Sequence, residues 1–144
     1  MTIMFIYYLL IFSKHGHLIA SYCPKNVVLD NEEELLSGFF SAIQIGYRHE
    51  YNIPIQSIKA KNCRLYFLND EVNNMVYLVS CNMLTRLDGE NLLKRLRDVI
   101  HNRFHIDGNK PCYYPTEIYD ELEDIITYEV QEMENHVKEK YCFS

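Results

Sequence analysis

The stretch SKHGHLIASY, residues 13–22, follows the N-terminal run MTIMFIYYLLIF, which carries no charge. Within this run, about residues 3–13 are apolar at odd and even positions alike. This pattern is typical of a strand that is covered on both faces of its sheet. Gly16 supplies the positive φ that tight hairpin turns require, and residues 18–23 then form a second strand. Pro24 ends this strand because proline cannot donate to a ladder. The chain therefore begins with a hairpin of two strands.

The same stretch also offers His15, His17 and Cys23 as metal ligands. Zinc needs three or four converging ligands, which a hairpin of this kind does not supply. We expect His15 and Gly16 to occupy a two-residue turn, with Lys14 and His17 facing each other as the last pair. His15 would then point to solvent, away from Cys23, and the turn is preferred to a metal site. Whether His15 contacts a partner or only water stays open.

Composition indicates one ordinary globular domain over residues 1–144. The net charge is −6, and a net-acidic chain is a poor nonspecific binder of nucleic acid, whose phosphates need a basic surface. The five cysteines are an odd number, lie far apart and form no CxxC pair. This pattern favours reduced thiols and a cytoplasmic location over a disulfide framework.

The apolar N-terminus raises the question of a targeting or membrane segment. No Lys or Arg precedes it, no small-residue cleavage site follows closely, and twelve uncharged residues are too few to span a bilayer as a helix. We therefore expect a buried strand here, with no stable membrane insertion.

An amphipathic helix is predicted over about residues 31–50. Asp30 is its expected N-cap, and the side chain of Glu33 is expected to reach back to the backbone N–H of Asp30. Its apolar residues repeat at spacings of three and four. The predicted buried stripe consists of Leu36, Phe40, Ile43 and Tyr47, and it is widened by Leu35, Phe39 and Ala42. Gly38 and Gly46 weaken this helix, and they indicate either close packing against a neighbour or simple tolerance.

Three further strands are expected at residues 55–61, 63–68 and 75–81. The first alternates imperfectly, and its Lys59 and Lys61 suit an exposed edge that must not aggregate. The last is apolar on both alternations and is therefore a second central strand.

Two helices follow, one capped by Asp88 and one running from about Pro115 to Glu139. Hairpin connections imply an antiparallel sheet, and two doubly apolar strands need helices on both faces. The sequence predicts an α/β (α+β) domain with three layers, α/β/α. The first helix would cover one face of a five-stranded antiparallel sheet, and the last two helices would cover the other face.

This order resembles a longin domain, part of the profilin-like group, over about residues 3–141. The motifs of the resemblance are SKHGHLIASY after an apolar strand, EELLSGFFSAIQ, IQSIKAKNCRLYFLND, MVYLVSC and ENLLKRLRDVI. Roadblock domains, also in this group, begin with a helix instead. The resemblance implies a sheet whose first and fifth strands are central, and a generally non-catalytic role in membrane-traffic or GTPase-regulating complexes. We expect no SNARE segment after the domain.

The remaining candidates for chemistry are weak. His101 and His105 are four residues apart and can share a helix face, but no Glu occupies the base position of an HEXXH site. Cys63 and Cys81 fall in predicted strands, where cysteine usually acts as a small hydrophobe. We predict no catalytic residue, no cofactor and no metal. A small metalloenzyme that uses His15, His17, His101 or His105 remains the rival hypothesis.

Charge is distributed unevenly along the chain. Residues 117–134 contain eight acidic residues and no Lys or Arg. Basic residues gather on the predicted second helix and around the edge strand, at Lys59, Lys61, Arg64, Lys94, Arg95, Arg97 and Arg103. Either each helix has a solvated face, or the surface is polarised to meet an acidic partner or anionic lipid. Tyr113 and Tyr114 stand apart from the predicted core stripes.

The sequence therefore predicts a non-catalytic protein-interaction module. Its expected partner is a small GTPase or another longin or roadblock domain, a second copy included, with any membrane association peripheral and through a complex. An adaptor or scaffold subunit of a larger complex is the alternative. The candidate surfaces are the exposed side of the first helix and the edge strand, through Ile55, Ser57, Lys59 and Lys61.

Overall fold

A computed structural model describes residues 5–24, 32–109 and 115–141. Its elements are β1 (Ile6–Ser13), β2 (Leu18–Tyr22), α1 (Glu32–Tyr51), β3 (Ser57–Lys59), β4 (Arg64–Asp70), β5 (Met75–Cys81), α2 (Arg86–Arg103) and α3 (Thr116–Tyr141). The strands form one sheet in the order β2-β1-β5-β4-β3, with every neighbouring pair antiparallel. The predicted class and strand number are confirmed, and β1 and β5 pair with each other in the interior, as the longin resemblance implies.

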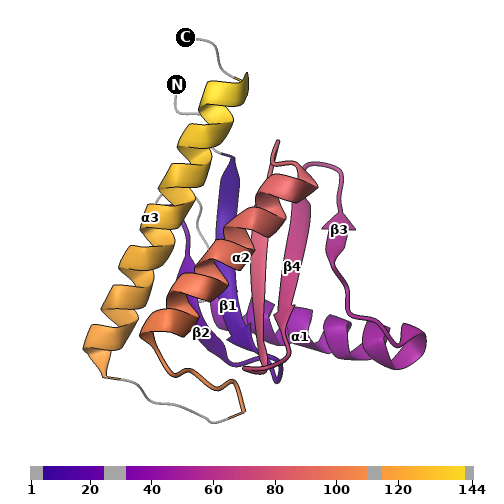
Figure 1. Ribbon diagram of the computed structural model, residues 1–144. Coiled ribbons are helices and arrows are strands. Elements are labelled where there is room, and N and C mark those ends of the chain that lie inside the picture. The colour runs from indigo at the N-terminus through magenta and orange to yellow at the C-terminus, as the bar shows by residue number, and fades with distance from the viewer. Residues whose placement is uncertain (1–4, 25–31, 110–114, 142–144) are drawn as a thin grey trace.

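The two faces of the sheet are covered by different helices, and Figure 1 shows α2 and α3 on one side with α1 on the other. Side chains alternate between the faces along each strand. Leu9 and Ile11 of β1 belong to the cluster with α2 and α3, whereas Leu10 and Phe12 belong to the cluster with α1. Every residue of β5 is buried. The prediction of two doubly covered strands and of one helix against two is therefore confirmed.

The first hairpin closes one residue earlier than predicted. Ser13 N donates to His17 O at 2.8 Å, and Gly16 N donates to Ser13 O at 2.8 Å. The loop therefore has three residues, Lys14 to Gly16, and Lys14 does not face His17 as a strand pair. Glycine at the third position, here with φ +93°, is the form that such three-residue loops take. The predicted two-residue turn is therefore wrong. The prediction that Gly16 supplies the positive φ of the turn is confirmed.

This turn also fixes the position of α1. A Cβ on Gly16 would lie 3.1 Å from Gly38 Cα, so the turn backbone and the helix backbone approach closely. Ser41 Oγ of the helix donates to Lys14 O at 2.6 Å. Because glycine has no side chain, the helix can lie directly over the end of the hairpin.

Two predicted boundaries need correction, and one predicted cap is not described. Thr85, not Asp88, is the N-cap of α2, because its Oγ1 accepts from Asp88 N at 3.1 Å and the helix begins at Arg86. β3 has three residues rather than the predicted span of 55–61, because only Ser57–Lys59 pair with β4. The predicted cap Asp30 lies outside the described residues. In the described ranges no helix is both long and apolar enough to cross a bilayer.

Candidate functional site

The side of α1 that points away from the sheet is apolar and exposed. Its members recur at helical spacings on one face and carry no charge. They are Leu35, Gly38, Phe39, Ala42, Ile45 and Gly46, called here the outer face of α1. Leu35 is 74% exposed, and Phe39 and Ile45 are each 57% exposed. Single exposed apolar side chains are common, but a group of them on one helix face is typical of an interaction surface.

This outer face corrects the sequence prediction that Leu35, Phe39 and Ala42 widen the buried stripe. The buried side of α1 instead includes polar residues. Ser37 Oγ donates to Glu33 O at 2.8 Å, and Gln44 bonds the backbone of the loop that follows the helix. Since these polar side chains are satisfied, they can share the inner face with Leu36, Phe40 and Ile43, and the remaining apolar residues face outward.

Exposed apolar side chains are concentrated in this part of the molecule. Among the described residues, ten large hydrophobic side chains are exposed, and six of them lie on α1 or directly after it. The six are Leu35, Phe39, Ile45, Tyr47, Tyr51 and Ile53. A Cβ on Gly38 or Gly46 would meet nothing within 4 Å, so neither glycine is needed for packing within the chain. Both leave room for a second backbone to approach α1.

The β3 edge of the sheet lies next to this helix in sequence, since α1 leads directly to it. Within the described part of the chain β3 pairs only with β4, whereas α3 packs against β2 at the opposite edge. Ser57, Lys59 and Lys61 are exposed, as predicted for this edge. The outward backbone groups of an edge strand can pair with a strand from another chain.

Ile55 departs from the prediction that grouped it with these exposed residues. It precedes β3 and belongs to the buried cluster under α1, with 9% of its surface exposed. Gln44 holds its backbone from both sides, because Ile55 N donates to Gln44 Oε1 at 2.8 Å and Ile55 O accepts from Gln44 Nε2 at 3.0 Å. Its side chain therefore belongs to the core and is not presented to a partner.

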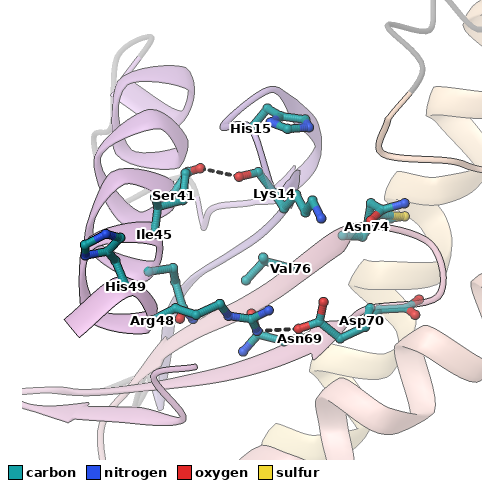
Figure 2. A pocket seen from close by; sticks show the side chains of 13 residues that line it. Lys14, His15, Ser41, Ile45, Arg48, His49, Asn69, Asp70, Asn74 and Val76 are labelled. Atoms are coloured by element: carbon teal, nitrogen blue, oxygen red, sulfur yellow. Dashed lines mark hydrogen bonds and ion pairs between the residues drawn. The ribbon is translucent and has the colours of Figure 1, made fainter. Parts of the chain in front are cut away.

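A cleft of about 340 Å³ opens between α1 and the two hairpin turns at the same end of the sheet. Figure 2 shows Val76 on its floor between Lys14 and Arg48, which extend from opposite sides. Arg48 forms an ion pair with Glu71, and this hydrogen bond holds the pKa of the Glu71 carboxyl below its usual value. Asp70 accepts from Asn73 Nδ2 at 2.8 Å.

Positive and negative charges in the cleft are equal in number when the histidines are neutral. Lys14 and Arg48 face Asp70 and Glu71, so the cleft has no net charge to select an ionic ligand. Ile45 lines the cleft and also belongs to the outer face of α1. The cleft is therefore an extension of that face rather than a separate ionic site.

The histidines considered as metal ligands do not gather into one site with other ligands in the described ranges. His15 Nε2 lies 3.3 Å from Asn109 Oδ1, so the turn touches a loop of its own chain. His101 Nδ1 lies 3.1 Å from Asn73 Nδ2, and His105 follows the end of α2, so the two do not share a helix face. Over the part of the chain that is described, no three His, Cys, Asp or Glu side chains gather where they could hold a metal ion.

Cys81, one of the two cysteines considered as nucleophiles, is fully buried in β5. Burial raises the pKa of its thiol to about 12, so the thiol stays protonated at neutral pH. Cys63 is partly buried just before β4. Cys81 belongs to the buried cluster under α2 and α3, and its Sγ donates to Arg64 O at 3.5 Å, so its surroundings are those of a core residue.

On the side of α2 and α3, basic and acidic side chains lie close together, so this side does not carry charge of one sign. These helices lie side by side (Figure 1), and Arg95 Nε of α2 lies 3.7 Å from Glu129 Oε2 of α3. Basic residues of α2 therefore face acidic residues of the same chain. The other basic group, around β3 and β4, is distant from the acidic helix. Tyr113 and Tyr114 lie outside the described residues.

No protein-family model matches this sequence, and no curated protein matches it. Several solved structures are similar in shape at low sequence identity, among them the three that follow. A roadblock/LC7 domain from Streptomyces avermitilis is 7% identical, with 67% of this chain and 87% of that chain covered at a TM-score of 0.49. The gliding protein MglB from Thermus thermophilus is 10% identical, with 88% and 79% covered at 0.49. The yeast R-SNARE Nyv1p, a longin domain protein, is 12% identical, with 98% and 97% covered at 0.47. The fold is defined by the strand order and the helix placement described above.

Proposed function

We propose that this protein is a non-catalytic protein-interaction module that binds its partner through the outer face of α1 and the β3 edge. The observation that carries the proposal is the concentration of exposed large apolar side chains on α1 and the segment after it. Burial of apolar surface is the main driving force of protein association, and an exposed apolar patch of this kind marks an interaction site.

The β3 edge orients the partner on the outer face of α1. Its outward backbone groups can pair with a strand of the partner, with Ser57, Lys59 and Lys61 beside the new strand. Because β3 has only three residues, strand pairing alone would bury little surface. The outer face of α1 supplies the apolar area, and the edge sets the orientation.

The partner that we propose is a small GTPase or another longin or roadblock domain, which can be a second copy of this chain. The longin-like motifs of the sequence support this choice. A cytoplasmic location, with any membrane association peripheral and through a complex, belongs to the same proposal. Both faces of the sheet have a core made within this one chain, so packing gives no support to a subunit that folds only inside a complex.

The test compares two exposed leucines on opposite sides of the sheet. Small GTPases from the same organism, loaded with GDP or with a non-hydrolysable GTP analogue, are titrated against the purified chain, and self-association is measured in parallel. Leu35→Asp in the outer face should weaken the binding that is found by at least about tenfold. Leu87→Asp on α2, where Leu87 is 66% exposed, is the matched control and should leave binding unchanged.

Equal losses from the two variants would show that the outer face of α1 has no special role. A wild-type chain that stays monomeric and binds no GTPase in either nucleotide state would remove the proposed partner class. Stoichiometric zinc or iron in the purified protein, measured by elemental analysis, would instead favour the metalloenzyme hypothesis.

A further inference from the structure

At the turn between β3 and β4 lies a group of basic side chains that have no acidic partner among the described residues. Lys59 ends β3, Lys61 lies in the turn, and Arg64 begins β4. All three are exposed. Across residues 5–24, 32–109 and 115–141, no carboxylate lies within 4.0 Å of any of their charged groups, although other basic residues do find acidic partners. The chain as a whole has 20 acidic residues and a net charge of −6, so this local excess of positive charge runs against its composition.

The strand register brings two of these charges together. Lys59 and Arg64 are directly opposite partners in the antiparallel pair of β3 and β4. Directly opposed residues project to the same face of a sheet, and like charges in such a pair destabilise it. Folding therefore gains nothing from this arrangement, which is consistent with a role in binding an anion.

The same residues line a hollow of about 690 Å³. Its other wall is the segment Asn82–Thr85, which leads into α2, and none of the residues that line the hollow is acidic. The side chains of Asn62 and Asn82 add neutral hydrogen-bond donors. Figure 1 shows the turn between β3 and β4 and the start of α2 at the same end of the molecule, so the positive end of the helix dipole adds to the same field.

We propose that this hollow binds a phosphate group. A phosphate presents several acceptor oxygens and up to about two negative charges, which match three cations better than a single carboxylate does. The guanidinium fork of Arg64 can hold two oxygens, and Lys59 and Lys61 act as point charges beside it. A free polyphosphate and the headgroup of an anionic lipid share this chemistry.

The phosphate site differs from the outer face of α1, although Lys59 and Lys61 also flank the proposed edge contact. Phosphate binding is therefore measured on the isolated chain, with no protein partner present. Its failure would leave the response of partner binding to Leu35→Asp untouched, and the reverse also holds.

The experiment titrates inorganic pyrophosphate into isotope-labelled protein and follows the backbone amides of residues 59–64 and 82–85. Vesicles of phosphatidylcholine, with and without phosphatidic acid, are tested by co-sedimentation. We expect saturable binding that weakens about tenfold in Lys59→Gln and in Arg64→Gln. Lys94→Gln removes the same charge from an exposed site on α2 and should change nothing.

Binding of pyrophosphate alone would identify a free phosphate ligand, and binding only of the phosphatidic acid vesicles would identify a lipid headgroup. Binding of neither would overturn the proposal, as would equal weakening by Lys94→Gln. Tighter binding of a glutamate hexapeptide than of pyrophosphate would overturn it in favour of an acidic protein segment. Lys59→Gln should leave the thermal midpoint unchanged or raise it, because it removes a like-charge pair, so weaker binding cannot be a result of unfolding.

Discussion

The two faces of the sheet are covered in different ways. On one face, α2 and α3 pack side by side, and their cluster with the strands contains twenty buried residues. On the other face, α1 packs alone, its cluster contains eight buried residues, and its outer side is apolar. The apolar side chains of the first face are therefore covered by helices of the same chain. The second keeps apolar surface in water, which is a cost unless another molecule covers it.

The largest predicted effect separates two neighbouring phenylalanines of α1. Phe40 is 5% exposed and packs on the sheet, whereas Phe39 is 57% exposed on the outer face. Phe40→Ala should lower the free energy of unfolding by about 3–5 kcal/mol, because it leaves a cavity in the core. Phe39→Ala should lower it by no more than about 0.5–1.5 kcal/mol, because the exposed ring loses only its edge contact with Phe40, 5.5 Å between ring centroids. Urea denaturation of the isolated chain measures both, and comparable losses would mean that Phe39 is not a surface residue.

A second pair contrasts the glycines of the two faces. A Cβ on Gly89 of α2 would lie 2.5 Å from Cδ2 of Tyr66, whereas a Cβ on Gly46 of α1 would meet nothing within 4 Å. Gly89→Ala should destabilise the protein by about 1–3 kcal/mol through overpacking. Gly46→Ala should stabilise it by about 0.5–1 kcal/mol, because alanine favours the helix. Thermal unfolding of the two variants checks both signs, and the same sign for both would contradict the contrast.

The smallest predicted effect lies between α2 and α3. Desolvation raises the pKa of the nearly buried Glu129 carboxyl, although Arg95 opposes the shift. A raised folded-state pKa adds stability below the unfolded pKa, and that stability is lost as pH rises through the folded pKa. Glu129→Gln should therefore be more stable than wild type at neutral pH, and the difference should shrink as pH falls toward 4.5, the ordinary value of the group, and stay small below it. Denaturation midpoints from about pH 3.5 to about pH 7.5 test this, and a variant less stable than wild type at neutral pH would show that the Arg95 contact outweighs desolvation.

Much of the fold could be predicted because it depends on alternation along the strands. β1 and β5 are apolar at nearly every position, and only a strand covered on both faces has that pattern. The positions of the hairpin and of the helices followed from glycine, proline and the helical repeat. The details that failed were local. Thr85 rather than Asp88 caps α2, and Gly16 closes a three-residue loop, because each depends on hydrogen bonds that several nearby residues can make.

The candidate site was only half visible in the sequence. The sequence predicts that the exposed side of the first helix binds a partner, but its apolar repeat places Leu35, Phe39 and Ala42 in the buried stripe. Periodicity cannot tell a wide inner stripe from two apolar faces, and here Gln44 occupies the inner face through its bonds to Ile55. The same bonds hold Ile55 in the core and away from the edge. They join residues eleven positions apart, so no local pattern reveals them.

The most direct test of the account is a hydrogen-exchange footprint of the protein with its partner, whether that is a GTPase or a second copy at high concentration. If the partner binds the outer face of α1 and the β3 edge, exchange should slow in α1 and β3 and stay unchanged in α2 and α3. Protection confined to α2 and α3, with α1 exchanging as it does in the isolated chain, would contradict it.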